Sequence, residues 1–138
     1  APGKAEMVQC GFGIMLSPAM FEEFALPGLR MVTEYMDRSC YHLDGTPQTR
    51  FLDLLCSLDR LHAIQWNPEP PAKPPLAWLD FFHAVRDRGR SLWVACDTET
   101  AIALTRQLGP DGLMVDVRDV KTLGQAEGVL ERLQEASD

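Results

Sequence analysis

The chain has 138 residues, of which 46% are apolar and 24% charged, the composition of an ordinary globular domain. Its 20 acidic residues outnumber its 13 basic ones, giving a net charge of −7. Because binding to phosphates requires clustered Lys and Arg, this charge argues against nucleic acid or an anionic membrane as a partner. The sequence also contains no apolar run near the roughly 20 residues that span a bilayer.

Apolar runs alternate with helical patterns from the N-terminus onward. The first run, 7–15, contains two glycines and is predicted to be a strand. A helix is predicted over 18–38, because Ser17 is a natural N-cap and Pro18 suits the first helical position. Pro27 lies inside this helix, so a kink or a break is expected there.

The same alternation continues to the C-terminus. Further strands are predicted at 39–44, 61–66, 91–96 and 112–117. Helices are predicted near 47–57, at about 76–89, from a cap at Asp97 to Leu108, and over 119–135. The proline-rich segment 67–75 is expected to be a stiff, extended loop. The fold class is therefore α/β with five parallel βα units, either a doubly wound open sheet or a piece of a (β/α)8 barrel.

The four cysteines are not arranged in a CxxC pair that would indicate a zinc or redox motif. Three of them, Cys10, Cys40 and Cys96, lie in apolar strand-like runs, where cysteine behaves as a small hydrophobic residue. We therefore expect reduced, buried thiols in a cytoplasmic protein, with a role as metal ligands as the alternative.

Three segments together resemble one protein family. They are Leu16-Ser-Pro-Ala-Met-Phe-Glu-Glu-Phe24, Tyr41-His-Leu-Asp-Gly45 and Ile64-Gln-Trp-Asn-Pro68. All three look like the C-terminal region of the uroporphyrinogen decarboxylase superfamily, which includes the heme-pathway decarboxylase and corrinoid-dependent methyltransferases acting on thiols. The resemblance implies that the five strands correspond to the fourth to eighth strands of a (β/α)8 TIM barrel, so that the chain is a partial barrel.

A partial barrel leaves two strand edges unpaired and an apolar inner face open, and such surfaces drive association. Three arrangements would resolve this: a homodimer, a partner chain that supplies the remaining strands, or a sheet that flattens. The homodimer is the simplest of the three for a chain of this length.

Candidate site residues follow from the rule that the active site of such a barrel forms where strands end and βα loops begin. They are His42, Asp44, Trp66, Asn67, Asp97, Asp116 and Arg118. His42 and Asp44 lie two apart on one strand, so they share a face and are the candidate catalytic pair. His42 would act as general acid or base with Asp44 setting its tautomer. Alternatively, Asp44 caps the next helix and His42 hydrogen-bonds within the layer at the strand ends.

A metal is a further alternative at this pair. In the thiol methyltransferase branch that the chain resembles, the corresponding place holds a His-x-Cys that binds zinc. Here Asp44 replaces the cysteine, and Val117 and Arg118 stand where the second family cysteine would fall. His42 and Asp44 could still hold zinc or another divalent metal, as a weak site or one suited to a harder ion.

Substrate-binding roles are open for four other residues. Trp66 is a flat wall for a ligand or a core residue, and Asn67 follows it at the strand end. Asp97 binds substrate or caps a helix. Arg118 holds a substrate carboxylate or forms a salt bridge to a neighbouring aspartate.

Three functions are therefore considered. The first is an enzyme-type domain acting by methyl transfer or decarboxylation-type chemistry on a small thiol or carboxylated substrate. Decarboxylation by the chain alone is not expected, because the family places the arginines and the aspartate for it near the first barrel strands. The second is a non-catalytic remnant that self-associates and binds a small molecule. The third is one subunit of a split enzyme.

Overall fold

The computed structural model of the chain describes residues 3–69 and 73–138. The strands are β1 Ala5–Val8, β2 Arg38–Asp44, β3 Ala63–Asn67, β4 Ser91–Cys96 and β5 Leu113–Val117. The α-helices are α1 Pro18–Met20, α2 Leu26–Tyr35, α3 Leu52–Cys56, α4 Leu79–Asp87, α5 Thr98–Leu108 and α6 Leu123–Ser137. A π-helical turn, Phe21–Ala25, joins α1 to α2, and 3-10 turns cover Gly13–Met15, Thr46–Phe51 and Pro75–Trp78.

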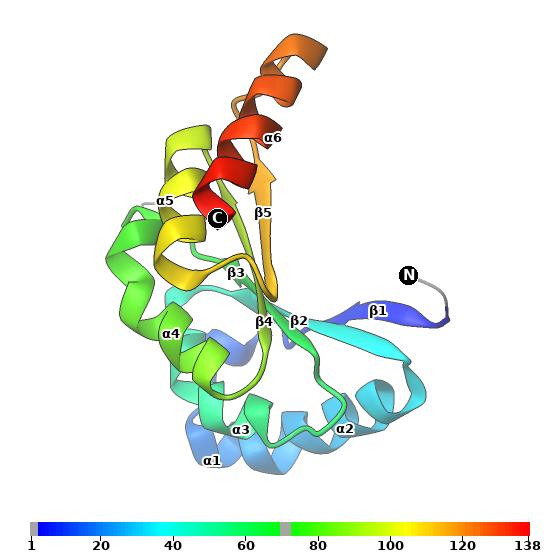
Figure 1. The fold of residues 1–138 in the computed structure, drawn as a ribbon. Coiled ribbons are helices and arrows are strands. Elements are labelled where there is room, and N and C mark those ends of the chain that lie inside the picture. The colour runs from blue at the N-terminus through cyan, green and yellow to red at the C-terminus, as the bar shows by residue number, and fades with distance from the viewer. Residues whose placement is uncertain (1–2, 70–72) are drawn as a thin grey trace.

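The predicted α/β class and the five parallel βα units are confirmed. The strands form one parallel sheet in the order β1-β2-β3-β4-β5 (Figure 1). Because consecutive parallel strands are joined by right-handed crossovers, the connecting helices fall on the same face of the sheet. Within residues 3–69 and 73–138 no strand pairs with the outer edge of β1 or β5, so the sheet is not closed.

The two faces of the sheet differ sharply in burial. Tyr41, Leu43, Ile64 and Val94 face the helices and are fully buried, in a core that includes Phe21, Phe51, Phe82 and Leu104. The alternate residues along the same strands face away from the helices and are partly buried or exposed. The polar side chains at the carboxyl end of the sheet lie on this open face.

Two predicted element bounds are wrong. The first strand ends at Val8 rather than at residue 15, because the chain turns at Cys10 and enters a 3-10 turn at Gly13. A Cβ on Gly13 would lie 2.9 Å from the side chain of Gln48, so glycine allows this turn to pack closely. The last helix begins at Leu123 rather than at residue 119, where the carboxylate of Asp119 bonds to the start of α5. The segment predicted as an extended loop, 67–75, lies partly outside the described residues.

A third correction concerns Pro27. The helix does not break at this residue, since α2 runs through it, and the irregularity comes just before it, in the π-helical turn. The backbone N–H of Leu26 donates to the carbonyl of Phe21, five residues back. Proline has no N–H with which to continue the α-helical pattern, and the wider turn accommodates that loss while the chain stays helical.

The described part of the chain contains no helix with the length and apolar composition needed to cross a membrane.

Candidate functional site

Strand register brings three of the predicted residues together. Asp44 lies opposite Asn67 where β2 and β3 end, and His42 lies opposite Gln65 one row earlier. All four side chains are on the open face, since they occupy alternate positions of their strands. The carboxyl ends of two neighbouring parallel strands thus place an imidazole, a carboxylate and two amides side by side.

A continuous hydrogen-bond chain links these four side chains. The Nδ1 atom of His42 is bonded to Oε1 of Gln65, and its Nε2 atom lies 3.4 Å from Nδ2 of Asn67. The same Asn67 nitrogen donates to Oδ1 of Asp44 at 3.0 Å. We call this group, Gln65–His42–Asn67–Asp44, the strand-end chain.

The two amides define the state of the imidazole. An amide oxygen only accepts, so Nδ1 of His42 must carry the proton that is shared with Gln65. An amide nitrogen only donates, so Nε2 presents its lone pair toward Asn67. The contact at Nε2 is long, so this lone pair is held only loosely and remains able to accept a proton from another donor.

The role of Asp44 differs from both sequence-based alternatives. Gln65, not Asp44, contacts the ring nitrogen that determines the tautomer. Asp44 does not cap the following turn either, because Gly45 precedes that turn and makes no side-chain cap. Asp44 instead orients the amide of Asn67, and its backbone carbonyl accepts from the side chain of Gln48 at 2.7 Å.

The loops around the strand-end chain are tied to one another. The N–H of Gly45 donates to the carbonyl of Asn67 at 3.0 Å, and the carboxylate of Glu69 accepts from the N–H of Thr46. That hydrogen bond lowers the pKa of Glu69. Arg50 reaches across to the carbonyl of Ile14 at 2.9 Å, which joins the first βα loop to the second. These contacts fix the rim of the site before any ligand binds.

Asp116 lies on the last strand, at the same end of the sheet, and Arg118 directly follows that strand. The guanidinium of Arg118 binds one carboxylate oxygen of Asp116, with Nη2 at 2.6 Å and Nε at 2.9 Å. The backbone N–H of Arg118 continues the sheet by donating to Cys96. The salt bridge that the sequence offered as an alternative is therefore present. It does not join the strand-end chain directly.

Trp66 lies on the opposite face of the sheet from His42. It is buried in the core against Trp78, Phe81 and Phe82, with ring centroids 4.8, 5.3 and 5.8 Å away. Its side chain is therefore a core residue in this structure and does not line the open face.

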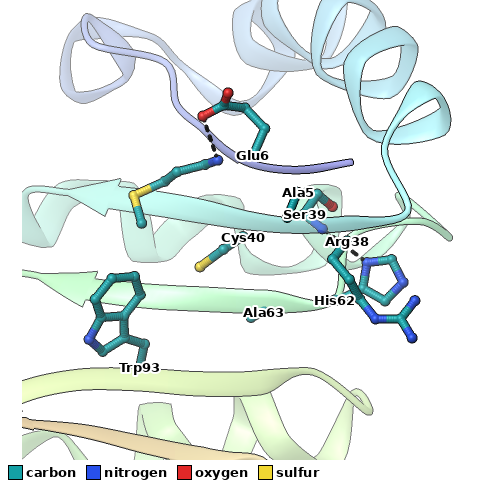
Figure 2. Close-up of a pocket in the computed structure, with 9 residues that line it drawn as sticks. Ala5, Glu6, Arg38, Ser39, Cys40, His62, Ala63 and Trp93 are labelled. Carbon is teal, nitrogen blue, oxygen red and sulfur yellow. Dashed lines mark hydrogen bonds between the residues drawn. The ribbon is translucent and has the colours of Figure 1, made fainter. Parts of the chain in front are cut away.

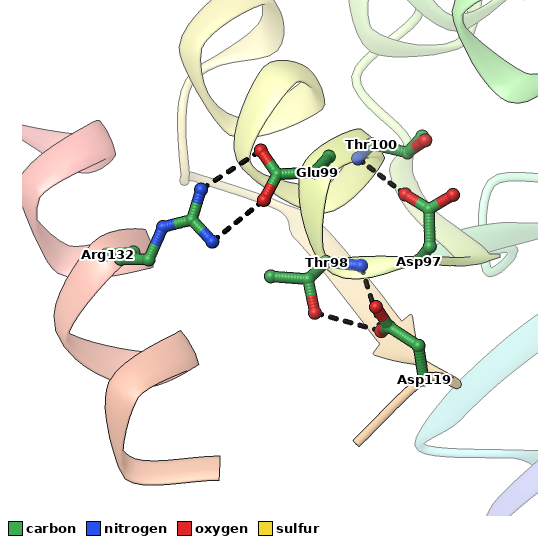
Figure 3. A network of polar contacts seen from close by, with 6 residues as sticks. All are labelled: Asp97, Thr98, Glu99, Thr100, Asp119 and Arg132. Atoms are coloured by element: carbon green, nitrogen blue, oxygen red, sulfur yellow. Dashed lines mark hydrogen bonds and ion pairs between the residues drawn. The ribbon is translucent and has the colours of Figure 1, made fainter. Parts of the chain in front are cut away.

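The side chain of Asp97 already forms a hydrogen bond at the start of α5, as Figure 3 shows. Its carboxylate accepts from the N–H of Thr100 at 2.8 Å, and this bond lowers its pKa. Asp119 accepts from both the N–H and the hydroxyl of Thr98, at 2.9 and 2.8 Å. The capping role that the sequence indicated for Asp97 is thus the one it performs here, and two carboxylates close this helix end.

The residues of the strand-end chain do not fit a zinc site. The described residues contain no group of three or more His, Cys, Asp or Glu side chains that could hold a metal ion. Both ring nitrogens of His42 face amides. Burial raises the pKa of Cys40 and of Cys96 to about 11, which disfavours the thiolate that zinc requires. We therefore derive no chemistry through a metal.

Gln65 is the functional candidate that the sequence analysis did not select. It lies inside the apolar run 61–66, and its position two residues before Asn67 places both on one face. A polar residue between the apolar Ile64 and Trp66 was the signal that could have identified it.

The open face also has an apolar hollow of about 400 Å³ at the amino end of the sheet (Figure 2). Met7, Cys40, Ala63 and Trp93 line it. Beside it, Nδ1 of His62 accepts from the backbone of Ser39 at 3.2 Å. The open face is thus apolar at one end of the strands and polar at the other.

Comparison of the chain with protein-family models, with curated proteins and with solved structures finds no match. The residues themselves therefore carry the functional argument.

Proposed function

We propose that this chain is a uroporphyrinogen decarboxylase-like domain that performs proton transfer on a small carboxylated substrate at the carboxyl end of its sheet. The strand-end chain is the observation that carries the proposal. It holds an imidazole in one orientation, with Nδ1 bonded to Gln65, on a face that a ligand can reach, and a general base needs such positioning.

The residues suggest how such a reaction would proceed. Nε2 of His42 takes a proton from a substrate carbon next to a carbonyl, and the electron pair of that C–H bond moves onto the substrate. The imidazolium that forms keeps its Nδ1–H bond to Gln65. Asn67, held by Asp44, turns its amide toward the reacting atom and orients it. The proton then returns from Nε2.

This chemistry is favoured over methyl transfer to a thiol. That reaction depends on a zinc-bound thiolate in the family branch the chain resembles, and the described residues do not supply such a zinc site. The open face leaves His42 accessible to water, so full activity requires a cover over this face, which a second copy or a partner chain would provide.

A second candidate is a non-catalytic module that binds a small molecule and self-associates. The uncovered apolar hollow around Trp93 favours it, because exposed concave apolar surface is typical of interaction sites.

A dicarboxylate with an exchangeable C–H separates the two candidates. We expect 2-oxoglutarate to shift the NMR signals of the side-chain amides of Gln65 and Asn67. We also expect the protein to speed deuterium uptake at the carbon next to the ketone. His42→Gln keeps an amide in place of the ring and should abolish the exchange, whereas His83→Gln, on the exposed face of α4, should leave it unchanged.

Each outcome has a distinct meaning. Shifts without exchange would favour the binding module over the enzyme. Exchange that persists in His42→Gln would refute the role given to the imidazole. If only 2-mercaptoethanesulfonate, a thiol, produced the shifts, the substrate class would be wrong.

A further inference from the structure

The free edge of β1 is bordered by an uncovered apolar groove. The groove has a volume of about 450 Å³ and runs between β1 and α2, with Val8, Ala25, Leu29 and Val32 in its lining. Gly28 also lines it, and a Cβ on this residue would meet no atom within 4 Å. The backbone N–H and C=O groups along the free edge of β1 therefore lie next to an uncovered apolar groove.

An exposed stripe that begins in the π-helical turn and continues along α2 extends this surface. Phe24, Met31 and Tyr35 are 65%, 73% and 65% exposed, and with Gly28 they are spaced as one face of a helix. Lys4, just before β1, places its ammonium 3.8 Å from the centre of the Tyr35 ring, which shows that the stripe adjoins the β1 edge. At roughly 200 Å² for a large side chain, these three residues expose about 400 Å².

The free edge of β5 has a matching arrangement. A groove of about 270 Å³ lies between β5 and α6, lined by residues that include Val115, Val129 and Leu130. Leu123 and Leu130, on this flank, are 76% and 66% exposed. By the same estimate these two residues expose about 300 Å² of apolar side chain. The two ends of the sheet thus offer similar surfaces, each a strand edge beside an apolar helix.

We infer that two copies of the chain join at these ends, with the β5–α6 flank of each copy against the β1–α2 flank of the other. Parallel pairing of β5 with β1 would satisfy the free backbone groups, and α6 would pack against α2 as neighbouring helices do in a layer of βα units. Because each copy carries one flank of each kind, a two-fold axis parallel to the strands and through the centre of the ring closes the pair into a ring of ten parallel strands.

The area supports a second copy as the partner. Each junction would bury about 700 Å² of these side chains, so two junctions reach about 1,400 Å², within the range of a stable protein interface. The apolar hollow around Met7 and Trp93 (Figure 2) would then face the interior of the ring. This inference goes beyond the proposed function and does not depend on the chemistry of His42.

Charge substitutions on the two flanks provide the test, read as molar mass by light scattering after size exclusion. The wild-type chain is expected to be a dimer across a tenfold range of concentration. Met31→Glu on α2 and Leu130→Lys on α6 should each give a monomer, because each disrupts both junctions of a homodimer. Both side chains are mostly exposed, so the monomers should keep the circular dichroism of the wild type.

Mixing the two variants makes the test specific to this geometry. The mixed pair has one unaltered junction and one in which the introduced glutamate would face the introduced lysine, so equal amounts should restore a dimer. The reversed pair, Met31→Lys with Leu130→Glu, should do the same. Leu76→Glu, a partly exposed leucine away from both flanks, is the control and should remain dimeric.

Three results would overturn the inference. A wild-type monomer would show that the edges need no second copy. A dimer that survives Met31→Glu or Leu130→Lys would place the interface elsewhere. Monomeric variants that do not recover on mixing would indicate like-with-like pairing of two α2 flanks or two α6 flanks instead.

Discussion

Replacing Gln48 by leucine removes a fully buried amide that joins three parts of the carboxyl end of the sheet. Its Oε1 accepts from the hydroxyl of Tyr41 at 2.6 Å, and its nitrogen donates to the carbonyls of Asp44 and Cys10, at 2.7 and 3.4 Å. Tyr41 is itself fully buried, so its hydroxyl would have no access to water in the variant.

The cost can be worked out from these contacts. Each net hydrogen bond contributes about 1 kcal/mol, and a buried partner left unpaired adds a penalty, so Gln48→Leu should cost about 3 kcal/mol. That is a large share of the roughly 5–15 kcal/mol that stabilises a typical domain. In urea, with a slope of about 1.5 kcal/mol per M, the unfolding midpoint should fall by about 2 M.

A double-mutant cycle identifies the bond responsible. Tyr41→Phe leaves Oε1 of Gln48 unpaired and should cost about 1–2 kcal/mol by itself. Combined with Gln48→Leu, it removes a hydroxyl that no longer has a partner, so the double variant should be more stable than the sum of the single effects predicts, by about 1–2 kcal/mol. Gln107→Leu, at an exposed position of α5, is the matched control. Additive costs, or a Gln48 variant as stable as the control, would refute the reasoning.

Three further predictions concern the residues around the site. Trp66→Ala should cost about 3–5 kcal/mol in urea unfolding, as a large core truncation does, and a smaller loss would contradict its place in the core. Asp97→Ala should lower the melting temperature more than Asp97→Asn, because asparagine can still accept from Thr100. Since the folded pKa of Asp97 is depressed, its contribution is present above the unfolded value near 3.9 and is lost as the pH falls below it. Either variant should remove that acid dependence, and its survival would point to another carboxyl. Burial and neighbouring arginine charges lower the pKa of His62, whose Nδ1 accepts from Ser39. Its neutral form therefore stabilises the fold fully above about pH 6.5 and less as the pH falls, so His62→Gln should flatten the stability profile between pH 7 and 5.

The sequence was sufficient to predict the element order, and local chemistry explains why. Ser17 accepts from the N–H of Met20, as an N-cap should, and Asp97 does the same for α5. Apolar runs bounded by such caps determine where strands and helices alternate. The first strand was the exception, because Phe12, Ile14 and Met15 continue its apolar pattern while standing exposed in a loop. Apolar character alone cannot distinguish a buried strand from an exposed loop.

The location of the site could be predicted from the sequence, but the hydrogen-bond partners of its side chains could not. The spacing of His42 and Asp44 placed both on one face at a strand end. Which residue lies beside each depends on how β2 and β3 are paired, and this register is a property of the whole sheet. For that reason Gln65 could not be assigned to the ring of His42 in advance. Trp66 points into the core because successive side chains of a strand point to opposite faces, and its neighbours Gln65 and Asn67 point to the open face.

The tautomer of His42 is the most direct test of the strand-end chain. Long-range ¹H–¹⁵N NMR of the imidazole, recorded at neutral pH, distinguishes a protonated Nδ1 from a protonated Nε2. The hydrogen bonds to Gln65 and Asn67 predict a proton on Nδ1 in the wild type, and a mixture of both tautomers in Gln65→Leu. A ring that carries its proton on Nε2, or that is unaffected by loss of Gln65, would contradict the proposed site.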